Sequence, residues 1–384
     1  MIRISFAAAF VIALAACQTP PSTSAPEATA PVASGAPSAG PIMAFAPEPS
    51  GVSTSIDYNV IDSFLDAAVI PLGPSTRTRL RTSRDFVLGT NLRFGHTSRL
   101  RLEGNKIPFS KLTPKTRAAT AEYLNSLVVI GNSVELTKLR RDEQLAYWFN
   151  LHNMMVISAI AQQYPVRNPR EMEIDGVPLH DAKLVTIKGV PLSLRDIRTR
   201  IVYAHWQDPR VIYGFFHGDL ASPSIRNKAW KRRDLKRNLN SNAKEFINSL
   251  RGVDNLGDDE LRVSPLYEEA RGLLFPEWPT DFKDHLLDFA NTEVAELVQT
   301  RGEVKFSAYE QTVADLAGGQ PYENAFTRYS TEDPAVRDLP PSARDMFAAI
   351  QEKFESAEFR ALRRGGTVTI IDQDDAEDDE GDLE

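Results

Sequence analysis

The sequence predicts an α+β fold: a mainly helical single large domain around a small mixed or antiparallel sheet, with a disordered N-terminal linker and an acidic C-terminal tail. Two observations lead to this prediction. Apolar residues recur at helical spacing over several long segments, whereas strand-like runs are short and few. The composition also changes sharply near residues 55 and 372. The body between these points is long enough for one large domain, or one domain with an appended subdomain.

Residues 1–16 have the pattern of an export signal. Arg3 supplies a positive start, and an apolar run broken only by Ser5 follows it. This run is shorter than the roughly 20 residues that a membrane-spanning helix needs, but suits the hydrophobic part of a signal peptide. It ends in Leu14-Ala15-Ala16-Cys17, which resembles the lipobox of bacterial lipoprotein precursors. The alternative is an ordinary signal peptide cut after Ala16.

The lipobox resemblance implies a diacylglyceryl group and an N-acyl chain on Cys17. Two or more acyl chains give a stable membrane anchor, whereas one chain binds only marginally. Gln18 follows the cysteine, where an aspartate is the usual signal for retention in the inner membrane of many Gram-negative bacteria. The resemblance therefore implies an envelope lipoprotein at the outer membrane, facing the periplasm.

Cys17 is the only cysteine in the chain. With Cys17 lipidated, no thiol remains for a disulfide, a thiolate metal ligand or a cysteine nucleophile. Cysteine-hydrolase and transglutaminase chemistry are thereby excluded. We expect no cofactor.

Four further segments follow the signal. Residues 17–55 are rich in Pro, Ala, Ser and Thr with almost no charge, and such composition predicts a flexible tether. Residues 56–317 form the main domain, and 318–371 a C-terminal helical extension. Residues 372–384 hold nine acidic and no basic residues, so most of the net charge of −8 belongs to a tail that we expect to be disordered.

Helical patterns predict helices at 56–69, 114–127, 142–163, 193–202, 228–250, 279–298 and 341–362. Short apolar runs predict strands at 183–187, 190–192, 210–216, 303–309 and 367–371. Lys188-Gly189 suits a hairpin turn, and Ser193 with Asp196 suits a helix cap. Asp142 suits the N-cap of its helix, and Gly252 a helix C-terminus.

The helix at 142–163 contains the most informative motif. Both of its helical stripes are apolar except for Asn150 and Asn153, so we expect the helix to be buried on most sides. A buried amide without a partner costs about 1–3 kcal/mol. The two asparagines should therefore bond to backbone groups or to a ligand.

This motif, Tyr147-Trp148-Phe149-Asn150-Leu151-His152-Asn153, resembles the signature of the family catalogued as domain of unknown function 547. Four weaker pieces follow in the family's order: 191–197, 208–211, 218–226 with Ser222-Pro223, and 304–309. The resemblance spans about 56–317. It names no reaction, because the family's biochemical activity is not established.

Two positions depart from the family pattern. His152 replaces the tyrosine of the signature, and His217 lies where members more often have a small residue or cysteine. Many bacterial members also have cysteine at the position of Ser222. Any mechanism that uses a cysteine thiol at the Ser222 position is therefore excluded for this chain.

The loop 217–226 is a second candidate for function. His217 could act as a base and Ser222 as a nucleophile. There is no G-x-S-x-G elbow, however, and Pro223 removes a backbone donor. A proline turn with His217 capping the backbone is the plainer interpretation. The six histidines show no short metal-binding spacing, so we expect no metal.

A third feature is a basic segment on the predicted helix at 228–250. Its members are Arg226, Lys228, Lys231, Arg232, Arg233, Lys236 and Arg237. A solvated helix face is the simplest interpretation. The alternatives are docking on anionic lipid or cell-wall polymer, or contact with the acidic tail. We expect no nucleic acid, since an exported lipoprotein rarely meets it.

Two hypotheses of function follow. The first is a non-catalytic binding or scaffold module with a polar site at Asn150, His152, Asn153, His217 and Ser222, and with cell-wall polymer or another envelope protein as partner. The second is an envelope hydrolase acting on peptide or amide bonds, with His217 as base and an asparagine as polariser. Convergence of His217, Ser222 and both asparagines in an open pocket would favour the hydrolase. Asparagines used entirely by backbone would favour the binding module.

Overall fold

The computed structural model describes residues 40, 42–49, 54–77, 100, 103–257, 259–307, 309–315, 319 and 369–371. Its α-helices are α1 (Asn59–Ala68), α2 (Pro114–Ser133), α3 (Arg141–Gln163), α4 (Tyr203–His205), α5 (Leu235–Ile247), α6 (Leu266–Leu274), α7 (Thr280–Leu287) and α8 (Thr292–Thr300). Its strands are β1 (Ser55–Asp57), β2 (Ile70–Gly73), β3 (Gly104–Lys106), β4 (Glu173–Ile174), β5 (Val177–Pro178), β6 (Val185–Ile187), β7 (Val190–Leu192), β8 (Leu261–Val263), β9 (Val304–Phe306) and β10 (Thr369–Ile371).

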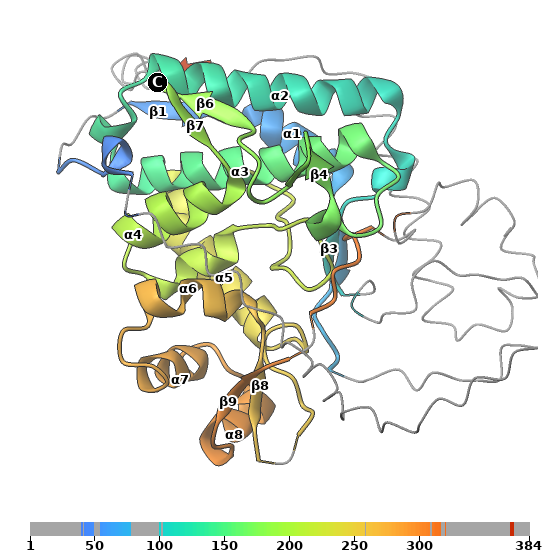
Figure 1. Ribbon diagram of the computed structural model, residues 1–384, viewed down its shortest axis with the longest axis vertical. Coiled ribbons are helices and arrows are strands. Elements are labelled where there is room, and N and C mark those ends of the chain that lie inside the picture. The colour runs from blue at the N-terminus through green and yellow to red at the C-terminus, as the bar shows by residue number, and fades with distance from the viewer. Residues whose placement is uncertain are drawn as a thin grey trace, which may run out of the picture. The chain divides into compact units, whose positions relative to one another are not determined.

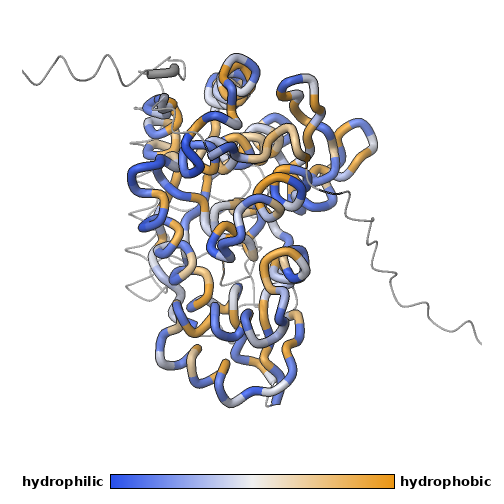
Figure 2. Tube along the Cα trace, turned by 90° about the vertical axis from the view of Figure 1, so that its left-hand side faces the viewer, coloured by the Kyte–Doolittle hydropathy of each residue, from blue (hydrophilic) through white to orange (hydrophobic). Residues whose placement is uncertain are grey.

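The predicted α+β class is confirmed. The ten strands form five two-stranded sheets within the described residues, and only the β8–β9 pair is parallel. Helices α2 and α3 pack side by side, and α2 runs along the top edge of the view in Figure 1 with α3 below it. Hydrophobic and hydrophilic residues alternate along most of these elements, as amphipathic elements around a shared core require (Figure 2).

Helix α3 is the centre of the core. It is buried on nearly all sides, and Tyr147, Trp148 and Phe149 are all fully buried. Helix α2 lies against it, starting with Pro114 after Thr113, whose side chain caps the backbone N–H of Thr116. α3 begins at Arg141 rather than after an Asp142 cap, and Asp142 lies in its first turn.

Two local predictions are confirmed around β6 and β7. Lys188 and Gly189 both have positive φ, as a tight hairpin turn requires, and they join the two strands. The N–H and hydroxyl of Ser193 each donate to Asp196 Oδ2, and Ser193 Oγ accepts the N–H of Asp196. This reciprocal cap starts η6, a wide π-type helix at Asp196–Val202.

The strand predicted at 210–216 is wrong. The segment forms a 3-10 helix, η7 (Pro209–Gly214), whose first turn is capped by the Asp208 side chain. An apolar run that is buried on all sides carries no periodicity, so a buried strand and a buried helix look alike in sequence. Gly214 packs directly on α3, where an added Cβ would lie 2.3 Å from the Phe149 ring.

The long helix predicted at 228–250 is shorter than expected. Residues 228–231 are not helical, η8 (Arg232–Asp234) is a 3-10 turn, and α5 begins only at Leu235. Because α5 ends at Ile247, Gly252 does not terminate it directly. The helix predicted at 279–298 is divided into α7 and α8, with Asn291 capping the second.

At both ends of the body, segments that are far apart in the sequence pack together. Within the range predicted as linker, Phe45 is buried and packs edge-on against Trp148. Strand β10, inside the predicted strand at 367–371, pairs antiparallel with β1. The predicted signal peptide, the helix at 341–362 and the acidic tail lie outside the described residues. No described helix is both long and apolar enough to cross a membrane.

Candidate functional site

The two asparagines of α3 are consumed by backbone groups. Asn150 accepts the N–H of Trp230 at 2.9 Å and donates to the carbonyl of the same residue at 2.9 Å. Asn153 donates to the Gly214 carbonyl at 3.0 Å and accepts the Phe216 N–H at 2.9 Å. Each side chain therefore fixes a loop against the central helix, and neither amide is aimed at a substrate.

The bond to Asn150 also explains why the predicted helix fails at 228–231. Both backbone groups of Trp230 are bound by Asn150, and the Asp62 carboxylate accepts the N–H of Ala229 at 2.6 Å. Backbone groups engaged in this way cannot join a helical ladder. The segment is held against α1 and α3 instead.

Ser222 does not meet the requirements of a nucleophile. Its Oγ donates to the backbone carbonyl of Asp219 at 2.7 Å, and the side chain is buried. Its own carbonyl accepts a bond from Arg251 at 3.0 Å. The hydroxyl is therefore part of the turn before Pro223, as the plainer interpretation predicted, but His217 does not cap the backbone as that interpretation expected, because its Nδ1 faces the Arg170 side chain.

His152 and His217 belong to a buried cluster that the sequence did not reveal. Their ring centroids lie 6.0 Å apart, and His180 lies 5.4 Å from His217. All three rings are at most 5% exposed. They come from three places in the chain: α3, the turn after β5, and the loop after η7.

Arg198 on η6 lies at the centre of this cluster. Its Nη1 donates to His152 Nε2 at 3.0 Å and to His180 Nδ1 at 3.2 Å. Its Nε and Nη2 form a bidentate pair with the Glu269 carboxylate on α6, at 2.9 and 2.8 Å. The 2% exposed Arg198 side chain thus joins η6, α3 and α6.

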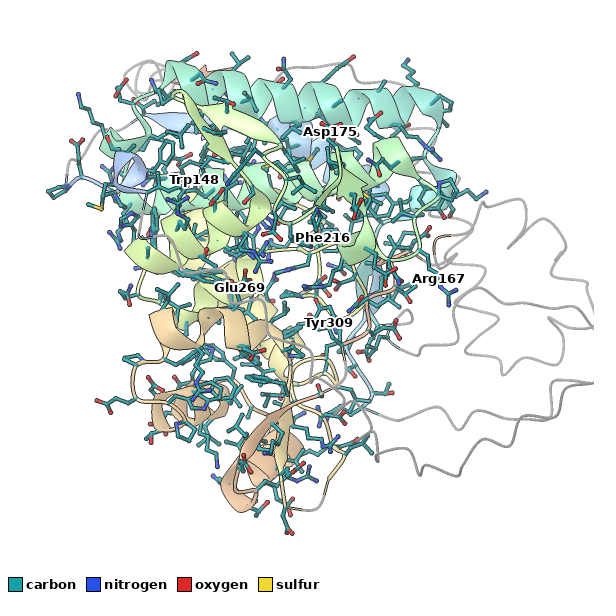
Figure 3. All side chains as sticks on the ribbon, in the orientation of Figure 1. Trp148, Arg167, Asp175, Phe216, Glu269 and Tyr309 are labelled. Carbon is teal, nitrogen blue, oxygen red and sulfur yellow. The ribbon has the colours of Figure 1, made fainter. Side chains whose placement is uncertain are left out.

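A second arginine completes the cluster from the other side. Arg170 donates to Asp219 Oδ2 at 2.9 Å and to the Tyr309 hydroxyl at 2.8 Å, and Tyr309 donates to Asp219 Oδ1 at 2.8 Å. Arg170 Nη2 also lies 3.4 Å from His217 Nδ1. Figure 3 labels Phe216, Glu269 and Tyr309, which mark three of the chain segments around the cluster.

The electrostatics keep the three rings neutral. Burial lowers the pKa of His152, His180 and His217 well below the ordinary value, and the charge of Arg198 lowers each pKa further. Burial alone would raise the pKa of Glu269, but Arg198 outweighs it and holds that pKa below the ordinary value. Burial raises the pKa of Asp219, and Arg170 offsets part of that rise.

Among the described residues, no group of three or more His, Cys, Asp or Glu side chains is arranged to hold a metal ion. In the cluster, Arg198 occupies one nitrogen of both His152 and His180, so these atoms are not available as ligands.

The basic segment is largely paired within the protein. Lys228 and Lys231 contact Asp66 and Asp62 of α1 at 3.4 and 2.5 Å. Arg232 lies 3.7 Å from Glu143. Arg237 pairs with Asp234, and the Arg226 guanidinium lies 5.0 Å from the Trp230 ring centroid. Only Lys236 and Arg237 of the seven lie on α5, so the predicted basic helix face does not exist as such.

A hollow connects the asparagines with this segment. It is lined on one side by Asn150, Asn153 and Met154 of α3, and on the other by Arg226 and Trp230, among others. Its apolar residues and fixed amides make it a gap between packed elements. His217 and Ser222 do not line it.

The sequence missed His180, Arg198, Glu269, Arg170, Asp219 and Tyr309. Tyr309 lies in the weak 304–309 piece, and the His217-x-Asp219 spacing is common by chance. The clearest signal is at Arg198, a charged residue between Ile197 and Ile201 on η6.

The comparisons with known proteins give one finding. A family model described as "Protein of unknown function, DUF547" matches residues 136–247. This match supports the resemblance drawn from the α3 motif and covers η4 through α5, a shorter span than the expected 56–317. No curated protein and no solved structure matches the chain.

Proposed function

We propose that the protein is an envelope lipoprotein whose folded body is a non-catalytic binding or scaffold module facing the periplasm. The anchor part of the proposal rests on the lipobox-like sequence ending in Cys17 and on Gln18 after it. The binding part rests on the chemistry of the polar site.

One observation carries the choice between binding and hydrolysis. The amides of Asn150 and Asn153, the hydroxyl of Ser222 and Nδ1 of His217 already have structural partners. Both asparagine amides bond backbone, and Ser222 Oγ donates to the Asp219 carbonyl. His217 Nδ1 faces Arg170, which can only donate, so this nitrogen cannot carry a proton away from a nucleophile.

The anchor is tested by cell fractionation of three full-length variants. Cys17→Ala should move the protein from the membrane to the soluble periplasmic fraction, whereas Ser22→Ala, a matched change within the tether, should leave it on the membrane. Gln18→Asp should shift it toward the inner membrane. A Cys17→Ala protein that stays membrane-bound would contradict the lipid anchor.

The partner is tested by crosslinking in intact envelopes, comparing the lipidated protein with Cys17→Ala. Recovery of cell-wall fragments or of a defined envelope protein supports the binding module and separates its two partner classes. The hydrolase hypothesis gains if Ser222→Ala abolishes an envelope cleavage product while the protein stays folded and anchored.

A further inference from the structure

The hydrogen bonds around the two arginines determine which ring nitrogen of each histidine carries the proton. A guanidinium donates and never accepts, and a neutral imidazole has one donor and one acceptor nitrogen. His152 Nε2 and His180 Nδ1 both face Arg198 and must accept. His217 Nδ1 faces Arg170 and must accept as well. The protons are therefore on His152 Nδ1, His180 Nε2 and His217 Nε2.

Only one of these three N–H groups has an acceptor among the described residues. His152 Nδ1 donates to Asn153 Oδ1 at 3.2 Å. His180 Nε2 is fully buried and has no hydrogen-bond partner. Within the residues that the structure describes, His217 Nε2 makes no hydrogen bond. An unpaired buried donor destabilises a fold, so a site that keeps one is suited to an acceptor from outside the chain.

The surroundings favour a negatively charged acceptor. The rings of His180 and His217 are 5.4 Å apart and tilted by 35°, close enough for one small group to reach both. The charged residues that act on the pKa of His180 are Arg198, Arg170 and Arg195, and those that act on His217 are Arg198 and Arg170. All of these are cations, and each is paired with a carboxylate: Arg198 with Glu269, Arg170 with Asp219 and Arg195 with Asp181. Two N–H donors beside guanidinium groups are the usual recognition elements for an oxyanion.

The cluster also reaches the protein surface. The side chains of Arg170 and Arg195 are 30% and 49% exposed, and that of Glu269 is 18% exposed. The two histidines, at 5% and 2% exposure, are direct neighbours of these groups: Arg170 Nη2 lies 3.4 Å from His217 Nδ1, and the Arg195 backbone N–H donates to the His180 carbonyl at 3.0 Å. Such burial leaves room only for the compact charged end of a ligand.

We propose that His180 and His217 form a binding site for a compact oxyanion, a carboxylate or phosphate group, with Arg170, Arg195 and Arg198 as the neighbouring guanidinium groups. This inference rests on the binding role proposed above and names its ligand chemistry, but it does not depend on the lipid anchor. His180 and His217 act here as donors to the ligand, and no bond is made or broken.

The test is a titration of the full chain carrying Cys17→Ala, with nitrogen-15 in the imidazole rings, followed by NMR. Sodium acetate and sodium phosphate are added separately at about pH 7.5, where unperturbed histidines are neutral, and sodium chloride keeps the ionic strength constant. The Nε2 signals of His180 and His217 should shift and saturate, while those of His205 and His285 should not. A response to acetate alone assigns a carboxylate, and a response to phosphate alone assigns a phosphate ester.

Three variants sharpen the test. His180→Phe removes the donor and should weaken binding by at least about tenfold, the usual effect of losing a hydrogen bond to a charged group. His180→Gln keeps an N–H near the Nε2 position and should retain a saturable response. His205→Phe is the matched control outside the cluster and should bind as the parent does.

Equal, unsaturable shifts at all histidines would overturn the proposal, since they would mean that only water occupies the site. If His180→Phe fails to fold, the titration of the parent chain decides alone. Failure of this titration with partners still recovered from envelopes would leave the binding module standing, because the two experiments do not share a readout.

Discussion

Lowering the pH from about 7.5 to about 5.5 is expected to destabilise the fold through the histidine cluster. Burial and Arg198 lower the pKa of His152, His180 and His217 in the folded protein. In the unfolded chain the same residues titrate near pH 6.5. The unfolded state therefore binds protons that the folded state excludes, and stability is present above pH 6.5 and lost as the pH falls below it.

The magnitude follows from linkage. A histidine that stays neutral when folded contributes a loss of about 1.4 kcal/mol between pH 7.5 and 5.5, so three contribute about 4 kcal/mol. This is a large part of a typical free energy of unfolding of 5–15 kcal/mol. His285, whose pKa burial lowers to about 4, also stays neutral down to pH 5.5 in the folded protein, so it adds a further loss of about 1.4 kcal/mol of the same sign.

The assay is urea unfolding at three pH values across this window. His180→Gln should reduce the loss by about 1.4 kcal/mol, the share of one histidine, whereas His205→Gln, at a partly exposed histidine, should change it less. Burial raises the pKa of Asp219, which acts in the opposite direction at lower pH, so the window ends at about 5.5. An unfolding free energy that does not change across the window would refute the assignment of three neutral rings.

Three further predictions concern stability, each measured as the free energy of unfolding. Asn153→Ala leaves two buried backbone groups unpaired and should cost about 2–4 kcal/mol; a cost near zero would mean that water replaces the amide. Gly214→Ala should destabilise by at least about 1–3 kcal/mol by overpacking, whereas Gly272→Ala on α6, where a Cβ meets nothing within 4 Å, should be neutral or stabilising. Arg198→Met should cost about 3–5 kcal/mol, because it leaves the mostly buried Glu269 with only the longer 3.8 Å contact to Arg195, and adding Glu269→Gln should recover part of that loss; equal losses in the single and double variants would argue against the pair.

The sequence predicts elements well where periodicity and capping agree. The period of α3 indicated a buried helix, and Lys188-Gly189 indicated a hairpin. Prediction from the sequence fails where a side chain from a distant part of the chain determines the backbone conformation. The segment 228–231 has helical composition, but Asn150 binds both backbone groups of Trp230, and no local pattern carries that information.

The candidate site shows the same limit. The burial of His152, Asn153 and His217 could be expected from the apolar segments around them. Their partners could not, because Arg198 and Glu269 lie far apart in the sequence and meet only when η6 packs against α6. The asparagine prediction succeeded for a general reason: a buried amide must find partners, and here the partners are backbone groups.

The pairing of β1 with β10 has a consequence for the order of events in the cell. β1 leaves the ribosome early, but its antiparallel partner β10 lies far later in the chain. Until β10 is made, the backbone hydrogen bond described for Ile56 is the one from its N–H to Glu143 at 3.0 Å. An unpaired strand is open to mispairing with another chain. Completion of this edge therefore waits for the synthesis of β10, and a product truncated or stalled before residue 369 would carry β1 as an open edge.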